Sequence, residues 1–168
     1  MRKWISMLYL YCCGYTLSAQ HRNEATLGIG IPEFLNVGLR TQAHQYQFGI
    51  SFGTLPGGLT NATYFTFSGD VRYHFLWKTE KSTLKKIYLN VGYTMLKLEN
   101  NDFIATEDFL KLRIGKKFNV TTKFGFEIEG GMAILTRHVV KKQKSGKTYT
   151  IIPYTPCIGL TFFFALGG

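Results

Sequence analysis

The sequence predicts an all-β protein, an eight-stranded antiparallel up-and-down transmembrane β-barrel. The main observation is residues 62–77 (ATYFTFSGDVRYHFLW), where apolar and polar side chains alternate. A period of two is typical of a β-strand. The stretch is long, and its polar face carries charge, which suits a strand between lipid and a polar barrel interior. No useful helical period follows residue 20, and short alternating segments fill the rest of the chain. The outward set of residues 62–77 is Phe65, Phe67, Val71, Tyr73, Phe75 and Trp77.

The first 19 residues are predicted to be a cleaved signal peptide, and residues 20–168 to form the barrel domain. Arg2 and Lys3 precede an apolar run over residues 4–15, and Ala19 supplies the small residue needed before Gln20. The run is too short for a stable membrane-spanning helix, which needs about 20 residues. A lipid anchor at Cys12 or Cys13 is not expected, because the residues before them are not the small ones that lipoprotein processing needs.

Cysteine content and charge narrow the class of protein. After removal of the signal, Cys157 is the single cysteine, which excludes an internal disulfide. The formal charge falls from +10 to +8, that is, 18 basic minus 10 acidic residues. No nucleic-acid motif accompanies this charge, so nucleic acid is not an expected partner, and an anionic lipid surface is the better candidate.

The first half of the domain contains segments that alternate over residues 26–31, 35–42, 45–54 and 62–77. Proline cannot donate to a ladder, so Pro32-Glu33 interrupts the first of these, and residues 26–42 form one bent strand or two. The outward residues are odd-numbered before residue 44 and even-numbered in residues 45–54. We therefore expect a two-residue turn at Ala43-His44 that pairs Gln42 with Gln45.

The second half predicts strands over residues 87–98, 109–120, 124–137 and 150–164, separated by polar connections. Lys116 breaks an outward apolar stripe near a turn, where its amine can reach the membrane interface. The predicted loops cover residues 55–61, 78–86, 99–108 and 141–147. A barrel of this kind has an even number of strands, which favours division at Pro32-Glu33 and a total of eight.

The turn Thr121-Thr122-Lys123 gives the most specific pairing. Outward residues are even-numbered on both flanking strands, so a three-residue loop pairs Val120 with Phe124. Lys117 is then opposite Glu127, and Arg113 is diagonal to Glu129.

Inward-facing charge is the most informative candidate functional feature. An eight-stranded barrel is just wide enough for side chains to fill, and buried charges must be paired, so we expect a packed network and no open pore. A water or ion channel and a proton-linked or small-ligand role are the alternatives. No catalytic, cofactor-binding or metal site is predicted, because Ser51, Ser68 and His74 show no triad order. The predicted network is Arg40, Asp70, Arg72, His74, Lys111, Arg113, Lys117, Glu127, Glu129 and Arg137.

Several segments together resemble small outer-membrane β-barrel proteins of Gram-negative bacteria, of the OmpX and OmpA-barrel type. These are the signal ending LSAQ, GIGIPEFLNVGLR, SGDVRYHF, NVTTKFGFEIEGG and PCIGLTFFF. The resemblance implies a monomer that is integral to the cell outer membrane. Its implied partners are outer-membrane lipid, lipopolysaccharide, the outer-membrane assembly machinery and a surface ligand at the extracellular loops. The chain departs from the pattern by continuing past Phe164.

Three functions remain at this point. The first is a structural or surface-interaction role of the adhesion type without enzymatic activity, favoured by the basic loop at residues 141–147. The second is an outer-membrane lipid-modifying enzyme. The third is a secreted soluble barrel that binds a small ligand, which would require an apolar interior.

Overall fold

The computed structural model describes residues 22–55, 62–76, 84–100, 103–143 and 152–166. The predicted signal peptide, Trp77 and most of the loops at residues 55–61, 78–86 and 141–147 lie outside these ranges.

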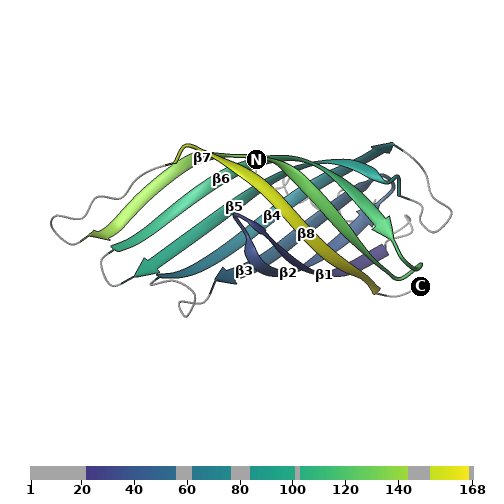
Figure 1. Ribbon diagram of the computed structural model, residues 1–168, viewed down its shortest axis with the longest axis horizontal. Helices are drawn as coiled ribbons and strands as arrows, with labels where there is room; N and C mark the ends of the chain where they lie inside the picture. The colour runs from purple at the N-terminus through teal and green to yellow at the C-terminus, as the bar shows by residue number, and fades with distance from the viewer. Residues whose placement is uncertain (1–21, 56–61, 77–83, 101–102, 144–151, 167–168) are drawn as a thin grey trace, which may run out of the picture.

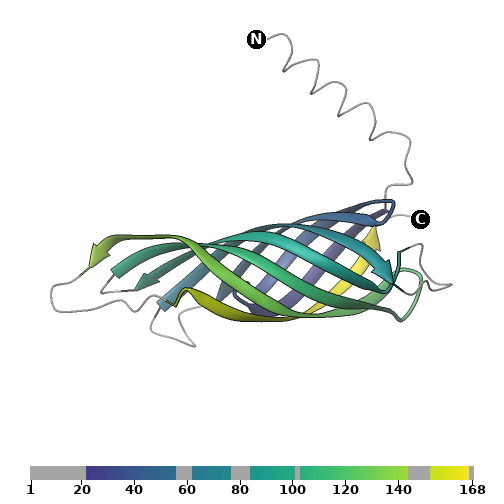
Figure 2. The ribbon, with the colours of Figure 1, turned by 90° about the horizontal axis from the view of Figure 1, so that it is seen from above.

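The described chain forms a closed antiparallel barrel in which each strand pairs with its neighbours in sequence and β1 closes onto β8. This confirms the predicted all-β, eight-stranded antiparallel barrel, including the division of the N-terminal segment into two strands. Figures 1 and 2 show the strands tilted around a common long axis. The strands are β1 (Arg22–Ile31), β2 (Phe34–Ala43), β3 (Tyr46–Leu55), β4 (Ala62–Leu76), β5 (Ile87–Asn100), β6 (Phe103–Asn119), β7 (Phe124–Gln143) and β8 (Tyr154–Leu166).

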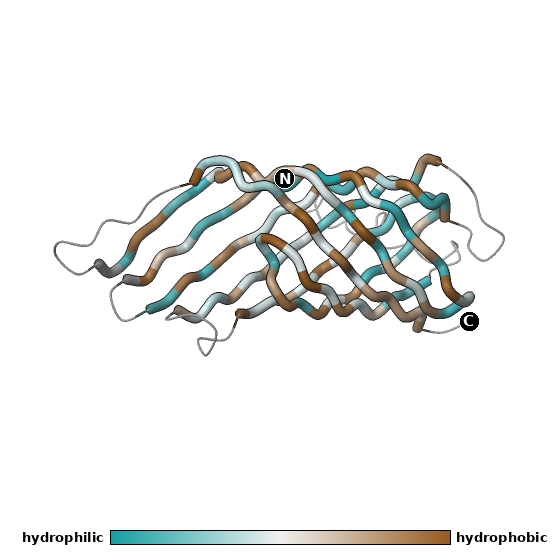
Figure 3. The backbone as a smooth tube through the Cα atoms, viewed as in Figure 1, coloured by the Kyte–Doolittle hydropathy of each residue, from teal (hydrophilic) through white to brown (hydrophobic). Residues whose placement is uncertain are grey.

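Apolar side chains face outward and polar ones face the lumen. Figure 3 shows the corresponding alternation of hydropathy along the strands. In β4, Phe65, Phe67, Val71 and Tyr73 are exposed, whereas Ser68 and Arg72 are buried. This is the arrangement of a barrel surrounded by lipid. The exposed belt continues around the barrel through residues such as Ile29, Val37, Ile50, Leu112, Ile128 and Ile158.

The predicted acidic loop at residues 99–108 is wrong. β5 continues to Asn100 and β6 begins at Phe103, with Leu98 paired to Ala105 and both side chains buried. Likewise, β7 continues to Gln143, into the predicted basic loop. Local polar composition suggested turns, but extended cross-strand pairing satisfies the backbone hydrogen bonds of these residues.

The turns give one correction and one confirmation. β2 and β3 pair Ala43 with Tyr46, so their loop is His44-Gln45 and not Ala43-His44. His44 adopts a φ of 56°, a left-handed conformation that a tight hairpin requires. By contrast, β6 and β7 pair Lys117 with Glu127, as predicted.

The strands end at different positions along the barrel axis, and the β1–β2 hairpin is shorter than the long strands β5, β6 and β7 (Figure 1). The ladder between β1 and β8 ends at the pair Ile31 and Ile158, so β8 extends four residues further, to Tyr154. Pro156 lies in this extension. Leu135 N donates a hydrogen bond to Pro153 O, so the backbone groups of odd-numbered β8 residues point to β7. The backbone groups of even-numbered residues, including the nitrogen of Pro156, therefore point to the other side, where β1 has ended. Proline, which lacks an N–H, is well suited to such an edge.

Candidate functional site: a charged lumen beside an apolar groove

Ion pairs run along the lumen and begin near the start of β1. Glu24 accepts hydrogen bonds from Lys117 Nζ at 2.8 Å to both carboxylate oxygens. Lys117 Nζ also lies 3.5 Å from Glu127 Oε1 and 3.8 Å from the centre of the Phe163 ring. The ammonium group is therefore balanced by charge although it is almost fully buried.

Glu127 is the centre of the network. Its Oε2 accepts a hydrogen bond from Arg40 Nη1 at 2.7 Å and a second one from Arg72 Nη1. Arg72 also pairs with Asp70 at 3.2 Å and with Glu129 at 3.4 Å. One carboxylate therefore joins side chains from β2, β4 and β6 to β7.

At the end of the network away from Glu24 lies Glu33, in the turn between β1 and β2. Arg113 Nη2 lies 2.5 Å and 2.6 Å from its two carboxylate oxygens, and Lys111 Nζ pairs with Oε1. Arg113 Nη1 also pairs with Glu129 Oε1 at 2.5 Å. The hairpin tip is thus tied across the lumen to β6.

The structure brings together most of the residues predicted to form the network. Arg22, which is partly exposed, lies 3.8 Å from Glu24 at the edge of the network. Within the network five buried cations meet five carboxylates, so their formal charges cancel: Arg40, Arg72, Lys111, Arg113 and Lys117, with Glu24, Glu33, Asp70, Glu127 and Glu129. The lumen of the described barrel is occupied by these side chains together with the buried Tyr88 and Phe163.

His74 lies beside the network without an ion pair to it. Its Nδ1 is 2.7 Å from Lys85 O and its Nε2 is 3.1 Å from Gln47 Oε1. Ser68 Oγ is bonded to Thr94 Oγ1 at 2.7 Å. His74 and Ser68 therefore do not form with each other the pair that a hydrolase needs.

Arg137 was predicted to face the lumen, but it faces outward and 70% of its side chain is exposed. A register shift causes this difference. Asp108 pairs with Arg137, whereas Phe109 pairs with Leu135, so Thr136 is an extra residue and reverses the facing of the residues beyond it.

The sequence interpretation missed two members of the network, Glu24 and Glu33. Glu24 has the parity of the inward-facing Thr26, so extending the first alternating segment by two residues would have found it. Glu33 lies in a turn, where alternation carries no information.

An apolar layer lies next to the Glu33 end of the network. Leu96, Phe109, Ala133 and Cys157 form a buried cluster there. Phe34, Tyr64 and Leu135 pack against this cluster. The lumen therefore changes from charged to apolar at the level where the β1–β2 hairpin ends.

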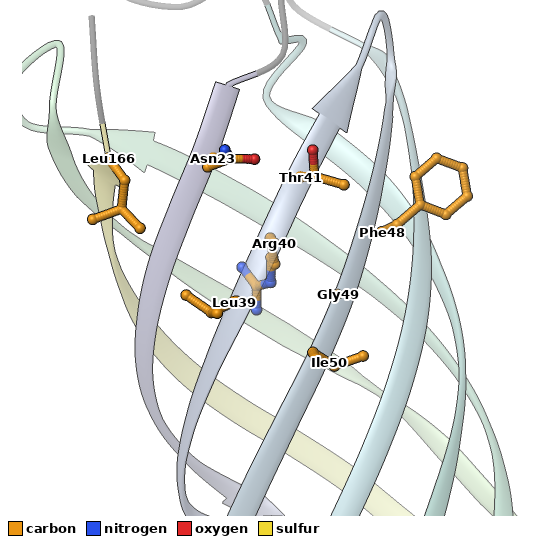
Figure 4. A pocket seen from close by; sticks show the side chains of 8 residues that line it. All are labelled: Asn23, Leu39, Arg40, Thr41, Phe48, Gly49, Ile50 and Leu166. Atoms are coloured by element: carbon orange, nitrogen blue, oxygen red, sulfur yellow. The ribbon is translucent and has the colours of Figure 1, made fainter. Parts of the chain in front are cut away.

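Two of the grooves on the outer side of the described barrel are lined by residues of β1, β2, β3 and β8. The larger, which we call the hairpin groove, has a volume of about 830 Å³ and surrounds the tip of the β1–β2 hairpin. It is lined by Ile29, Gly30, Ile31, Phe34, Leu35, Leu55, Ile128, Ile158, Gly159 and Leu160. The smaller has a volume of about 490 Å³, and Figure 4 shows its lining residues from β1, β2, β3 and the end of β8, with Arg40 and Asn23 among them. The hairpin groove has no charged or hydroxyl side chain in its lining, so it suits an apolar ligand.

In the part of the chain that the structure covers, no three His, Cys, Asp or Glu side chains are grouped so that they could hold a metal ion. None of the described segments is a helix long and apolar enough to cross a membrane.

Comparison with known proteins gives one family. The model of the COQ9 family, a family of ubiquinone biosynthesis proteins, matches residues 62–121. The match covers β4, β5 and β6, about a third of the chain. No curated protein matches the sequence.

This comparison corrects the predicted identity. The resemblance to the OmpX and OmpA-barrel type is wrong, because the family that matches is COQ9. The segments that suggested the resemblance share an alternation of apolar and polar residues. Any lipid-exposed barrel needs that alternation, so it does not identify a family.

The predictions that depended on this resemblance are therefore also wrong. The COQ9 match contradicts the adhesion-type role, the outer-membrane lipid-modifying enzyme and the secreted soluble ligand-binding barrel. It also contradicts lipopolysaccharide and the outer-membrane assembly machinery as partners, and the cell outer membrane as the location.

Proposed function

We propose that this protein binds a prenylated quinone, or a biosynthetic precursor of one, and serves coenzyme Q biosynthesis as a binding protein and not as an enzyme. The hairpin groove is the observation that carries the proposal. Its lining is aliphatic apart from Phe34, and it opens on the outer side of the barrel among exposed apolar residues. The COQ9 match supplies the class of ligand.

The chemistry of the groove supports binding of the tail of such a molecule. A polyprenyl chain offers only apolar surface, which matches the apolar lining of the groove, and from lipid its binding would be driven by van der Waals packing. The groove contains the side chains of Ile29, Ile31 and Leu35 on one side and those of Ile158 and Leu160 on the other. A tail bound there would exchange lipid contacts for contacts with a shaped apolar surface.

A non-enzymatic role is supported by the hydrogen bonds of the buried polar groups. His74 is bonded to Lys85 and Gln47, and the carboxylates of Glu127 and Glu129 are held by arginines. A general base needs access to the proton that it removes, and these groups are already paired inside the lumen.

The test is a binding titration on the full chain in lipid nanodiscs, with a ubiquinone that carries a short prenyl tail, followed by native mass spectrometry. We expect one quinone per barrel and no binding of the quinone ring without a tail. In Ile158→Trp, the indole fills the hairpin groove and should weaken binding about tenfold or more.

Ile50→Trp is the matched control. Ile50 is also an outward isoleucine in a strand, with 51% exposure against 64% for Ile158, but it lines the smaller groove. Unchanged affinity in this variant locates the ligand in the hairpin groove. Equal loss in both variants, or no bound quinone in the wild type, would refute the proposal.

A further inference from the structure

Basic side chains gather at one end of the barrel. This is the end at which β1 and β5 begin and at which the β2–β3 and β6–β7 turns lie. The residues in or beside these connections include Arg22, Lys85, Lys86 and Lys123, which we call the basic mouth. It lies at the opposite end of β1 from the hairpin groove.

Two of these cations lie on the lumen side of the wall. Arg22 is paired with Gln42, whose side chain is buried in the lumen, and residues paired across a ladder share a face. Lys86 precedes β5, and its carbonyl oxygen accepts a hydrogen bond from Lys117 N at 2.7 Å. Lys86 therefore continues the ladder opposite the inward-facing Lys117. Both Arg22 and Lys86 are placed at the opening of the lumen and not on the lipid-facing wall.

The basic mouth has an excess of positive charge in the part of the chain that the structure describes. The carboxylate beside it, Glu24, is 1% exposed and is held by Lys117 at 2.8 Å. Arg22 reaches Glu24 only at 3.8 Å, and its side chain stays 23% exposed. The negative charge of Glu24 is therefore already balanced inside the lumen.

The other end of the barrel has mixed charge. There Lys97 pairs with Glu99 at 2.9 Å, and the His138 ring lies 3.3 Å from the Glu107 carboxylate. The two ends of the described barrel thus differ in charge, and the end with the basic mouth is the one that attracts anions.

Hydrogen bonds tie the connections of the basic mouth to one another. Arg22 donates through Nη2 to Thr122 O, which joins the start of β1 to the β6–β7 turn. Lys85 N donates to Gln45 Oε1 at 3.3 Å, which joins the segment before β5 to the β2–β3 turn. The backbone that carries these cations is therefore arranged before a ligand binds, which lowers the entropy lost on binding.

From this arrangement we propose that the basic mouth docks an acidic, extended segment of a partner protein. Carboxylates of the segment pair with the ammonium groups of Lys85, Lys86 and Lys123 and with the guanidinium group of Arg22. Cations around an opening with low-dielectric walls concentrate their field there and draw in an anionic chain. Alternate side chains of an extended segment lie about 7 Å apart, so a short segment can reach cations on several turns.

The inward cations favour a protein segment over anionic lipid. Lipid headgroups surround the outer wall, where Lys116 lies with its Nζ 5.0 Å from the centre of the Phe118 ring. They do not reach Arg22 and Lys86 on the lumen side. A single-stranded nucleic acid would need aromatic side chains on which its bases stack. The described connections at this end, residues 44–45, 84–86 and 120–123, contain no Phe, Tyr or Trp.

The test is the binding of a labelled peptide to the full chain in nanodiscs of phosphatidylcholine, a lipid without net charge. In the short peptide Glu alternates with Gly, and its control has Gln in place of each Glu. We expect the acidic peptide to bind and the control not to bind. The affinity should fall about tenfold or more between about 50 and about 300 mM salt, because salt screens exposed charges.

The variant combines Lys85→Gln, Lys86→Gln and Lys123→Gln. The hydrogen bonds that the structure shows for these three residues use their backbone atoms, so the barrel should still fold, which resistance to protease checks. Binding should weaken about tenfold or more. Lys97→Gln at the other end and Lys116→Gln on the outer wall are matched controls, and each should stay within about twofold of the wild type.

Cross-linking locates the peptide on the wild-type protein. A carbodiimide joins a carboxylate to an amine in contact with it, and mass spectrometry then identifies the lysine. We expect Lys85, Lys86 or Lys123 to carry the peptide. Cross-links mainly at Lys97, an equal loss of affinity in Lys116→Gln and in the triple variant, or no binding by the wild type would overturn the basic mouth.

Two further measurements decide the class of partner. An oligonucleotide of equal charge that binds more tightly than the peptide would overturn the choice of a protein. Loss of peptide binding in nanodiscs that contain phosphatidylglycerol would assign the basic mouth to lipid and would also overturn it. Neither result bears on quinone binding, because the hairpin groove lies at the other end of β1.

Discussion

Replacement of Glu127 by glutamine is expected to destabilise the barrel strongly, because this carboxylate is the shared partner of Arg40, Arg72 and Lys117. Glu127 is 1% exposed, and the two arginines are 7% and 2% exposed. Removing one partner of a buried ion pair costs about 3 to 5 kcal/mol. With a denaturant dependence of about 2 kcal/mol per molar, the urea midpoint of the lipid-refolded protein should fall by about 2 M.

The geometry also ranks the couplings within this cluster. Arg40 lies 2.7 Å from Glu127, whereas Lys117 lies 3.5 Å from it and is held at 2.8 Å by Glu24. A double-mutant cycle of Glu127→Gln with Arg40→Met should therefore give a coupling energy of about 2 kcal/mol, and the cycle with Lys117→Met a smaller one. The control is Glu99→Gln, which breaks the exposed pair with Lys97 and should cost about 0 to 1 kcal/mol. Coupling near zero for Arg40, or an equal cost for Glu99→Gln, would refute this description of the lumen.

Three further outcomes are expected. Gly125→Ala should lower the stability by about 1 to 3 kcal/mol in urea unfolding, because its Cβ would lie 2.2 Å from Phe118 O and 2.5 Å from the Phe163 ring; wild-type stability would contradict this. Pro156→Ala should change the stability by less than about 0.5 kcal/mol, since position 156 lacks a β1 partner, and a large gain would show that the new N–H finds an acceptor on that side. The protein should show no steady unit conductance in planar bilayers, because Arg72 and Tyr88 are among the side chains that fill the lumen; an open pore would disprove the packing.

The sequence was sufficient to predict the fold because alternation is imposed by the barrel itself. In residues 62–77 every second side chain must face outward, and the observed exposure of Phe65 and Phe67 follows that rule. The pairing of Lys117 with Glu127 was also predictable, because a three-residue turn and the parity of two strands leave only one register.

The remaining features depend on contacts that parity does not describe. Arg137 was placed in the lumen because the extra residue Thr136 has no signal in the local alternation. Glu33 was missed because it reaches the lumen from a turn, and the extension of β5 to Asn100 is stabilised by pairing with distant residues. The hairpin groove depends on where β1 and β8 stop pairing, which is a property of the assembled wall.

The alternation of apolar and polar residues could not predict the family and the function, for a different reason. Facing outward or inward determines only whether a residue is apolar or polar, and many different amino acids satisfy that requirement. The alternation that predicts the barrel is therefore shared by unrelated families, and it suggested the wrong relatives. The groove residues Ile31 and Ile158 are unremarkable members of the outward set when they are read in sequence.

Both proposals require that apolar side chains face lipid and polar ones face the lumen, and spin labels at Phe67 and Ser68 test this most directly. Phe67 is 41% exposed on the outside of β4, and Ser68 is 1% exposed inside it. In bilayers, the label at position 67 should be relaxed strongly by molecular oxygen, which concentrates in lipid, and the label at position 68 only weakly. Stronger relaxation at position 68 than at position 67 would invert the barrel and contradict the central claim.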